Sequence, residues 1–113
     1  VVNVISAAAF LHTPGGSLYG AAKAALLHFT RSMAAEYALS GIRVNALAPG
    51  PTDTTMVRNT GEAGAASMAR STRLGRLADA DEMVGAVLYM ASDASSFMTG
   101  QCMTVDGGLV PAR

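Results

Sequence analysis

The sequence predicts an α/β fold, as the C-terminal part of a doubly wound sheet of parallel strands flanked by helices. Three short apolar runs rich in β-branched residues alternate with two helical patterns. The joints between them are short and contain glycine or proline. A strand–helix–strand unit with such joints is almost always a right-handed crossover between parallel strands. The 113 residues have the length of one small domain.

The first expected strand covers residues 1–6, a β-branched run typical of a strand that is buried on both faces. A loop over 7–16 follows and ends in Pro-Gly-Gly. The stretch 17–39 contains a single glycine and no proline, so it predicts a helix, with Ser17 as its N-cap and Gly41 at the left-handed position after it. Its apolar residues recur at helical spacing: Ala21, Ala22, Ala25, Leu26, Phe29, Met33 and Tyr37.

A second strand is expected over 42–48, stopped by the Pro-Gly-Pro at 49–51. Residues 52–74 are small, polar and weakly periodic, which predicts one or two short helices. Asp79 and Glu82 form an acidic variant of the capping box and begin a further helix. The apolar face of that helix is expected to carry Met83, Val84, Val87, Leu88 and Ala91.

The last expected strand covers 101–106 and ends at Gly107-Gly108. Three strands and two helices make half of a doubly wound sheet, with one strand edge unpaired and one face bare. Residue 1 lies inside a strand, so we expect the missing half on the N-terminal side. Residues 1–113 are then the C-terminal portion of a single domain, and no internal repeat or interdomain linker is present.

Composition excludes several functions. The formal net charge is 0 and no basic run exists, which argues against a nucleic-acid partner. Hydrophobic residues make up 50% of the chain and charged residues 14%, against about 25% in ordinary domains, which predicts extensive buried surface. No apolar run has the length of a membrane span, and no secretory signal opens the chain. One cysteine, Cys102, excludes an internal disulfide and fits a reducing cytoplasm.

Tyr19 and Lys23 stand four residues apart in the first helix and therefore share one of its faces. A free tyrosine has a pKa of about 10, and a nearby ammonium lowers that pKa by stabilising the phenolate. Such a pair suits proton exchange with a substrate near neutral pH. By spacing alone, a surface tyrosine beside a solvated lysine is the more common explanation.

Ser6 lies where the first strand ends, and Pro49-Gly50 lies where the second strand ends. Ligands of open α/β sheets bind beyond the carboxyl ends of the strands. The start of the first helix reaches the same rim, so Ser6, Tyr19 and Lys23 can converge there. A glycine after a strand-ending proline allows the backbone to approach a flat ligand closely. Each feature alone is also an ordinary turn signal.

Taken together in order, these motifs resemble the C-terminal half of the short-chain dehydrogenase/reductase family, over essentially all 113 residues. Tyr19-Gly-Ala-Ala-Lys23 matches the family's Tyr-x-x-x-Lys signature, thirteen residues after the serine that ends the first strand. Further segments match in order: Val2 to Ser6, Arg43 to Gly50, Leu74-Gly75-Arg76, Leu88 to Asp93, Thr99-Gly100-Gln101 and Val105 to Gly108. The family has a Rossmann-like fold.

The resemblance implies a nicotinamide-dependent oxidoreductase that uses NAD or NADP and a small carbonyl or alcohol substrate. It makes Tyr19 the catalytic acid or base, Lys23 the group that tunes it and binds the nicotinamide ribose, and Ser6 the group that polarises the substrate oxygen. It places Tyr19, Lys23, Pro49, Gly50, Thr52 and Thr54 at the cofactor, although the family often has Ile or Val in place of Thr52. The family's asparagine and its glycine-rich first turn have no counterpart in the chain.

The resemblance also implies a cytoplasmic protein that forms a dimer or tetramer when intact. The alternative function is a catalytically silent piece, competent only for packing or subunit association through its Ala-rich first helix. Neither NAD nor NADP is favoured by these residues.

Other polar residues were weighed against different functions. His12 and Asp53 would be needed with Ser6 for a hydrolase, but no Gly-x-Ser-x-Gly elbow is present. His12 is expected to be a loop residue or part of the substrate rim. His28 is distant in sequence, and two histidines alone do not make a metal site. Asp106 is expected to tether a turn, Cys102 to be a small core residue, and the seven methionines to serve core or subunit packing.

Overall fold

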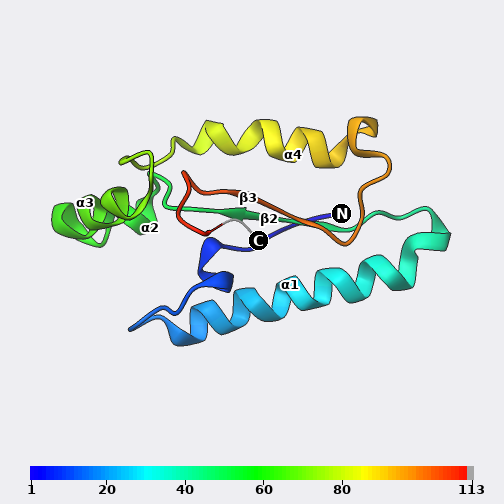
Figure 1. The fold of residues 1–113 in the computed structure, drawn as a ribbon, viewed down its shortest axis with the longest axis horizontal. Coiled ribbons are helices and arrows are strands. Elements are labelled where there is room, and N and C mark those ends of the chain that lie inside the picture. Colours follow the sequence, from blue (N-terminus) through cyan, green and yellow to red (C-terminus); the bar gives the residue numbers. More distant parts are fainter. Residues whose placement is uncertain (112–113) are drawn as a thin grey trace.

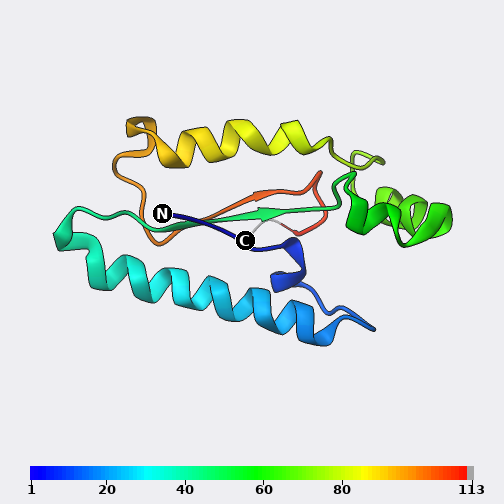
Figure 2. The same ribbon diagram turned by 180° about the vertical axis from the view of Figure 1, so that it is seen from behind.

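The computed structural model describes residues 1–111, which form three layers (Figure 1). The middle layer is a parallel sheet of strands β1 (Val2–Val4), β2 (Asn45–Pro49) and β3 (Cys102–Val105), in the order β1-β2-β3. Helix α1 (Ser17–Tyr37) covers one face of the sheet and helix α4 (Val84–Ala91) covers the other, as seen from both sides (Figures 1 and 2). The predicted α/β class and parallel sheet are confirmed.

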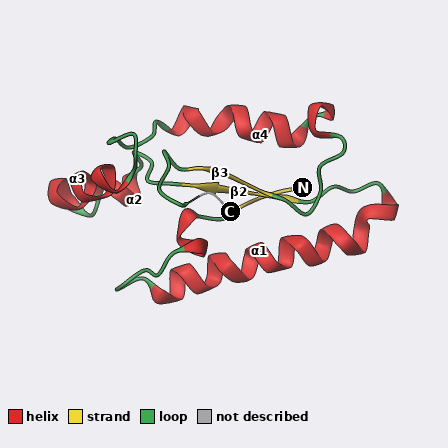
Figure 3. Ribbon diagram, viewed as in Figure 1, coloured by secondary structure: helices red, strands yellow, loops and turns green. Residues whose placement is uncertain are grey.

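Two short helices, α2 (Thr55–Arg58) and α3 (Gly61–Ser71), lie beyond the carboxyl end of β2 and project from the layered body (Figure 3). They confirm the short helices expected in 52–74. We call residues 53–71 the arm. Short 3₁₀ helices join the other elements: η1 (Ala7–Phe10), η2 (Ala38–Ser40), η3 (Ala80–Met83) and η4 (Asp93–Ser95).

Strand β2 is the centre of the core. Val44 and the first four residues of β2 are each at most 1% exposed. Ala46 and Ala48 pack with Ile5 and with Leu27 of α1. The buried Asn45 donates to the carbonyl of Met98 and accepts from the amide of Gln101, so its amide side chain fixes the start of β3 beside β2.

Strand β1 differs from its prediction. Within residues 1–111 it pairs with β2 alone, and Val4 is 52% exposed, so the expectation of burial on both faces is wrong for this chain. A β-branched run shows that a strand is suited to burial, but whether it is buried depends on other segments that cover it. The other two strands were expected at 42–48 and 101–106, and each differs at its ends from the strand observed.

Helix α1 begins at Ser17, but its N-cap is Gly16, without a side-chain hydrogen bond, so the predicted Ser17 cap is wrong. The end of the helix expected over 17–39 is a 3₁₀ turn, η2, and Gly41 after it has the predicted positive φ, +77°. The buried face of the helix consists of Gly20, Leu27, Thr30 and Ala34. Most of the predicted apolar stripe faces outward instead, including Phe29, which is 56% exposed.

The expected helix after Asp79 begins as η3 and continues as α4. The capping box forms as predicted, with the amide of Asp79 donating to the Glu82 carboxylate at 2.8 Å. Asp106 also behaves as expected, because its carboxylate accepts from the amides of Gly108 and Val110 and closes the turn after β3. Cys102 is half-buried against the core. Within residues 1–111 no helix combines the length and the hydropathy needed to span a membrane.

Candidate active site

A cleft of about 990 Å³ opens at the carboxyl end of the sheet, between the end of β1, the first turns of α1, the loop after β2 and the arm. This size suits a ligand as large as a cofactor with its substrate, since small-molecule sites commonly measure about 300–1,000 Å³. Every residue that the sequence nominated lines it: Ser6, Tyr19, Lys23, Pro49, Gly50, Thr52 and Thr54. Their assigned roles are considered under the proposed function.

Tyr19 and Lys23 lie on the face of α1 that borders the cleft. The Lys23 Nζ is 5.7 Å from the centre of the Tyr19 ring, and it donates to the carbonyl of Val4 at 3.2 Å. An ammonium has three N–H donors, and Val4 accepts one of them. The bond to the end of β1 holds the lysine at the rim, while the Tyr19 side chain remains 45% exposed to the cleft.

Gly20, the neighbour of Tyr19, allows α1 to lie close to the segment that follows Ser6, at Ala8 and Thr13. A Cβ at this position would lie 2.8 Å from the Thr13 Oγ1 and 3.3 Å from the Ala8 carbonyl oxygen. Only glycine allows this approach without displacing η1. In the sequence, Gly20 is the single glycine of the helical stretch 17–39, and its place inside the Tyr-x-x-x-Lys signature is the signal that points to this close approach.

Ser6 serves as the N-cap of η1, where its Oγ accepts from the amide of Ala8 at 3.1 Å. This bond uses an oxygen lone pair and leaves the hydroxyl proton available for donation. Ser6 is therefore a turn former at a strand end, as its position there also predicts. A capped serine is also a fixed one, which suits a group that must orient a substrate.

The loop after β2 is held against β3. The Gly50 amide donates to the carbonyl of Val105 at 2.9 Å, and a Cβ on Gly50 would lie 2.6 Å from the Asp106 Cα. Thr52 donates through its Oγ1 to the Gly50 carbonyl at 3.0 Å, and Thr54 caps α2 by accepting from the Val57 amide at 3.4 Å. Both threonine oxygens keep acceptor capacity toward the cleft.

The arm leaves and rejoins the body at neighbouring points. At its start, Thr52 pairs with Ala78, the Asp53 amide donates to the Ala78 carbonyl at 2.8 Å, and the Ala78 amide donates to the Pro51 carbonyl at 3.0 Å. The two strands of the connection thus form a short parallel ladder at the base of the arm.

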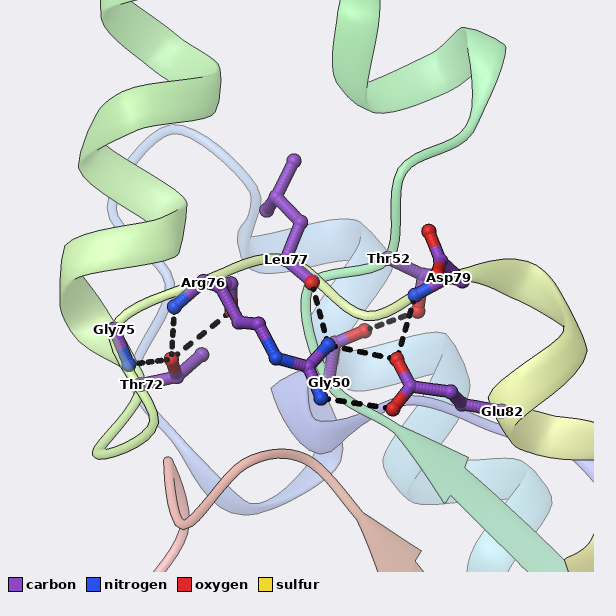
Figure 4. Close-up of polar contacts among 8 residues, drawn as sticks. All are labelled: Gly50, Thr52, Thr72, Gly75, Arg76, Leu77, Asp79 and Glu82. Carbon is purple, nitrogen blue, oxygen red and sulfur yellow. Dashed lines mark hydrogen bonds and ion pairs between the residues drawn. The ribbon is translucent and has the colours of Figure 1, made fainter.

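The exit of the arm is held by a second group of contacts, which we call the clasp: Thr72, Arg76 and Glu82. Figure 4 shows the Arg76 guanidinium facing the Glu82 carboxylate, with two bonds of 2.8 Å, while the same carboxylate accepts from the Asp79 amide. The Thr72 hydroxyl accepts from the amides of Gly75 and Arg76 (Figure 4). Its single proton is within hydrogen-bond reach of the carbonyls of Ala69 and Arg76.

The clasp has a clear electrostatic signature. The hydrogen bond from Arg76 and then that from the Asp79 amide lower the pKa of Glu82 to about 2, and the same pairing raises the pKa of Arg76. Both side chains are substantially exposed, 54% for Arg76 and 39% for Glu82. The clasp thus stays ionised over the ordinary pH range.

The cleft also contains residues that sequence reasoning missed. Met56, Met68 and Met83 line it and so lie outside the core, while subunit packing by these three stays a prediction. Met90 matches the expectation of core packing, being 2% exposed. His12 lines the cleft, as one of its two interpretations required, whereas His28 is exposed on α1.

A parallel sheet with helices on both faces, and with a tyrosine and a lysine four residues apart at its carboxyl rim, is typical of Rossmann-like proteins. The family model described as enoyl-(acyl carrier protein) reductase matches residues 1–110. The chain belongs to the short-chain dehydrogenase/reductase family.

Among curated relatives, the chain is 45% identical over 108 residues to a cis-4-hydroxycyclohexanecarboxylate dehydrogenase of Sinomonas cyclohexanicum, covering 96% of this chain and 43% of that protein. It is 39% identical over 110 residues to a 3-oxoacyl-acyl-carrier-protein reductase of Thermotoga maritima, covering 97% of this chain and 45% of the relative. The chain therefore spans less than half the length of these relatives.

Solved structures share the fold. A gluconate 5-dehydrogenase from Burkholderia cenocepacia, in complex with NADP and tartrate, is 37% identical with a TM-score of 0.92. That comparison covers 99% of this chain and 45% of the other. A 4-hydroxyisoleucine dehydrogenase complexed with NADH is 29% identical with a TM-score of 0.87, covering 99% of this chain and 47% of that chain.

Proposed function

We propose that the protein transfers a hydride between NAD(P)(H) and a small carbonyl or alcohol substrate. The observation that carries this proposal is that Ser6, Tyr19 and Lys23, from two separate elements, line one cleft at the carboxyl end of a parallel sheet. Relatives and neighbours named as dehydrogenases and reductases, and neighbours solved with NADP and with NADH, support it.

The residues present fit a nicotinamide. A hydroxyl-bearing loop at Thr52 and Thr54, an ammonium at Lys23 and a backbone turn at Pro49-Gly50 line the same cleft, which supplies donors and acceptors for a ribose and a carboxamide. The 113 residues contain no Gly-x-Gly-x-x-Gly turn. We therefore propose that residues 1–113 are the C-terminal portion of one domain and bind only the nicotinamide end.

A nicotinamide cofactor held by these residues would supply the hydride for the carbonyl carbon and would itself be oxidised. Tyr19 gives its phenolic proton to the carbonyl oxygen, so that the C=O becomes a CH–OH. Ser6 donates a hydrogen bond to that oxygen as negative charge develops on it. Lys23 stabilises the tyrosinate left behind and contacts the ribose. The reverse sequence oxidises an alcohol.

Replacing Tyr19 by Phe tests this proposal. In the full-length protein, Tyr19→Phe keeps the ring and removes the proton, so turnover should fall at least about 10²–10⁴-fold while NAD(P)H affinity changes little. The matched control is Tyr37→Phe, at the far end of the same helix, where the side chain is also exposed. A Tyr19→Phe protein that reduces its substrate at the wild-type rate would overturn the catalytic assignment.

The second candidate, a silent association module, is favoured by the outward apolar face of α1, where Leu18 is 86% and Phe29 56% exposed. Such side chains on one helix are suited to burial against another chain or another part of the same chain. A dimer or tetramer as the assembly, and the cytoplasm as the compartment, stay predictions. Cofactor titration separates the two functions, since an association module has no affinity for NAD(P)H.

A further inference from the structure

The cleft has two chemically different walls. The wall formed by β1, α1 and the loop after β2 carries the hydroxyls and the ammonium described above. The other wall comes from the arm, η3 and the segment after β3, and it is mainly apolar: Met56, Val57, Met68, Ala80, Met83 and Leu109. It also carries the four hydroxyls of Thr54, Thr60, Ser67 and Ser71, but no charged side chain.

The charged side chains of the cleft are also confined to one wall. Among the described residues that line the cleft, Lys23 is the single Lys, Arg, Asp or Glu. The ions nearest the arm are paired with one another instead, Arg58 with Asp53 at 3.4 Å and Arg76 with Glu82 at 2.8 Å. A carboxylate placed on the methionine wall would lose its water without gaining a cation, which costs far more than burying a methyl group there.

The methionines have a further property in common. They come from α2, α3 and η3, three elements that the base of the arm and the clasp bring to the same cleft. A thioether side chain is unbranched and polarisable, so it adapts to apolar bodies of varied shape. Met56 is 67% exposed, while Met68 and Met83 are half-buried.

From these walls we infer that the substrate is an uncharged ketone or secondary alcohol with a hydrocarbon body. Its oxygen lies at Ser6 and Tyr19, and its body lies on Met56, Met68 and Met83. The inference rests on the proposed function for the place of the oxygen. It separates this protein from relatives named for a cyclohexanecarboxylate and a gluconate, compounds that carry a carboxylate.

A matched pair of ligands tests the inference by binding. The full-length protein, labelled with ¹³C at the methionine methyl groups, is titrated with 4-methylcyclohexanone and with 4-oxocyclohexanecarboxylate, which differ only in the group opposite the carbonyl. The signals of Met56, Met68 and Met83 should shift with the neutral ketone, which should bind at least about tenfold more tightly than the carboxylate. Met33 and Met90, which do not line the cleft, serve as internal references.

A charge placed on the wall should reverse the preference. Met68→Arg should favour the carboxylate, Met68→Leu should keep the ketone preference, and Ala66→Arg should also keep it because Ala66 is exposed on the same helix outside the cleft. Equal or tighter carboxylate binding by the wild type, or shifts confined to Met33 and Met90, would overturn the inference.

The proposed function can fail separately. Tyr19→Phe removes turnover but should leave the methionine shifts and the ligand preference unchanged. Ketone-selective binding by a wild-type protein without hydride transfer would reject the proposed function and keep the ligand class. Turnover by a wild-type protein that prefers the carboxylate would keep the proposed function and reject the ligand class.

Discussion

Individual residues at the rim of the sheet are held by contacts that leave their chemistry available. Ser6 is fixed as a cap and Lys23 by the Val4 carbonyl, while the Tyr19 ring remains open to the cleft. The positions of these side chains depend in turn on neighbouring glycines. Gly20 and Gly50 are the clearest examples, because each makes an approach that a Cβ would prevent.

Lys23 is expected to affect both turnover and cofactor affinity, so one substitution should change the two quantities together. Lys23→Met should lower both turnover and NAD(P)H affinity, because the same ammonium serves Tyr19 and the ribose. Lys23→Arg should restore little, since a planar guanidinium does not replace a compact point charge. Fluorescence titration of NADH and NADPH measures the affinity, and an unchanged dissociation constant in the Met variant would remove Lys23 from the cofactor site.

Gly50 offers a stability test with an internal control. Gly50→Ala puts a methyl group 2.6 Å from the Asp106 Cα, a backbone atom that cannot move aside cheaply, so we expect a loss of about 1–3 kcal/mol in the free energy of unfolding. Gly85→Ala, in α4 with nothing within 4 Å of the new Cβ, should gain about 0.4–1 kcal/mol. Chemical denaturation of both variants measures the contrast, and equal midpoints would contradict it.

At the scale of elements, the prediction from sequence was best where structure is local. The Tyr19–Lys23 spacing, the Asp79–Glu82 capping box and the turn at Gly41 depend on a few neighbouring residues, and all three are found in the structure. The exposure of Val4 and the outward stripe of α1 depend on which surfaces are covered by distant segments. A hydrophobic pattern shows that a face is apolar but not what covers it.

The apolar wall of the site could not be predicted for the same kind of reason. Met56, Met68 and Met83 are separated by more than ten residues each, and only the path of the arm brings them to one cleft. The weak periodicity of residues 52–74 predicts that short helices form there, but it does not predict how those helices are oriented relative to the sheet. The sequence predicts one part of the clasp, the capping role of Glu82, but it does not predict the bond between Glu82 and Arg76.

The clasp gives the arm a dependence on pH. The pKa of Glu82 is about 2 in the folded protein and about 4.3 in an unfolded chain, so its contribution is complete above about pH 5 and is lost as the pH falls toward 2. Wild-type protein should therefore lose thermal stability over this range more steeply than Glu82→Gln. Melting temperatures measured from pH 7 to pH 2 test this, and parallel curves for the two proteins would contradict it.

At the scale of the whole molecule, residues 1–111 leave considerable apolar surface uncovered. The edge of β1 has no partner in this part of the chain, and Val4, Leu18, Phe29 and Leu88 are each more than half exposed. An open strand edge beside apolar side chains favours pairing with another chain. Less than half the length of the relatives is present to cover these surfaces.

The 113-residue chain on its own should therefore self-associate and turn over no substrate. Its affinity for NADH or NADPH should be weaker than about millimolar, because groups remote from the nicotinamide supply much of a dinucleotide's binding energy. Sedimentation reports the size, and fluorescence titration reports the affinity. A monodisperse monomer that binds either cofactor at micromolar concentration would contradict both expectations.

The ladder of Thr52 and Ala78 at the base of the arm has a consequence for how such a protein can change. Because residues 53–77 depart and return at adjacent points, they form a cassette whose length and composition can vary while its two junctions stay in register. Insertions there would lengthen a closed loop, whose entropic cost grows only slowly with length. Ser6, Tyr19 and Lys23, to which the proposed function gives the chemistry, lie outside the cassette, whereas Thr54 lies within it. Exchange of this one contiguous segment should therefore change the arm side of the cleft while leaving those three residues in place.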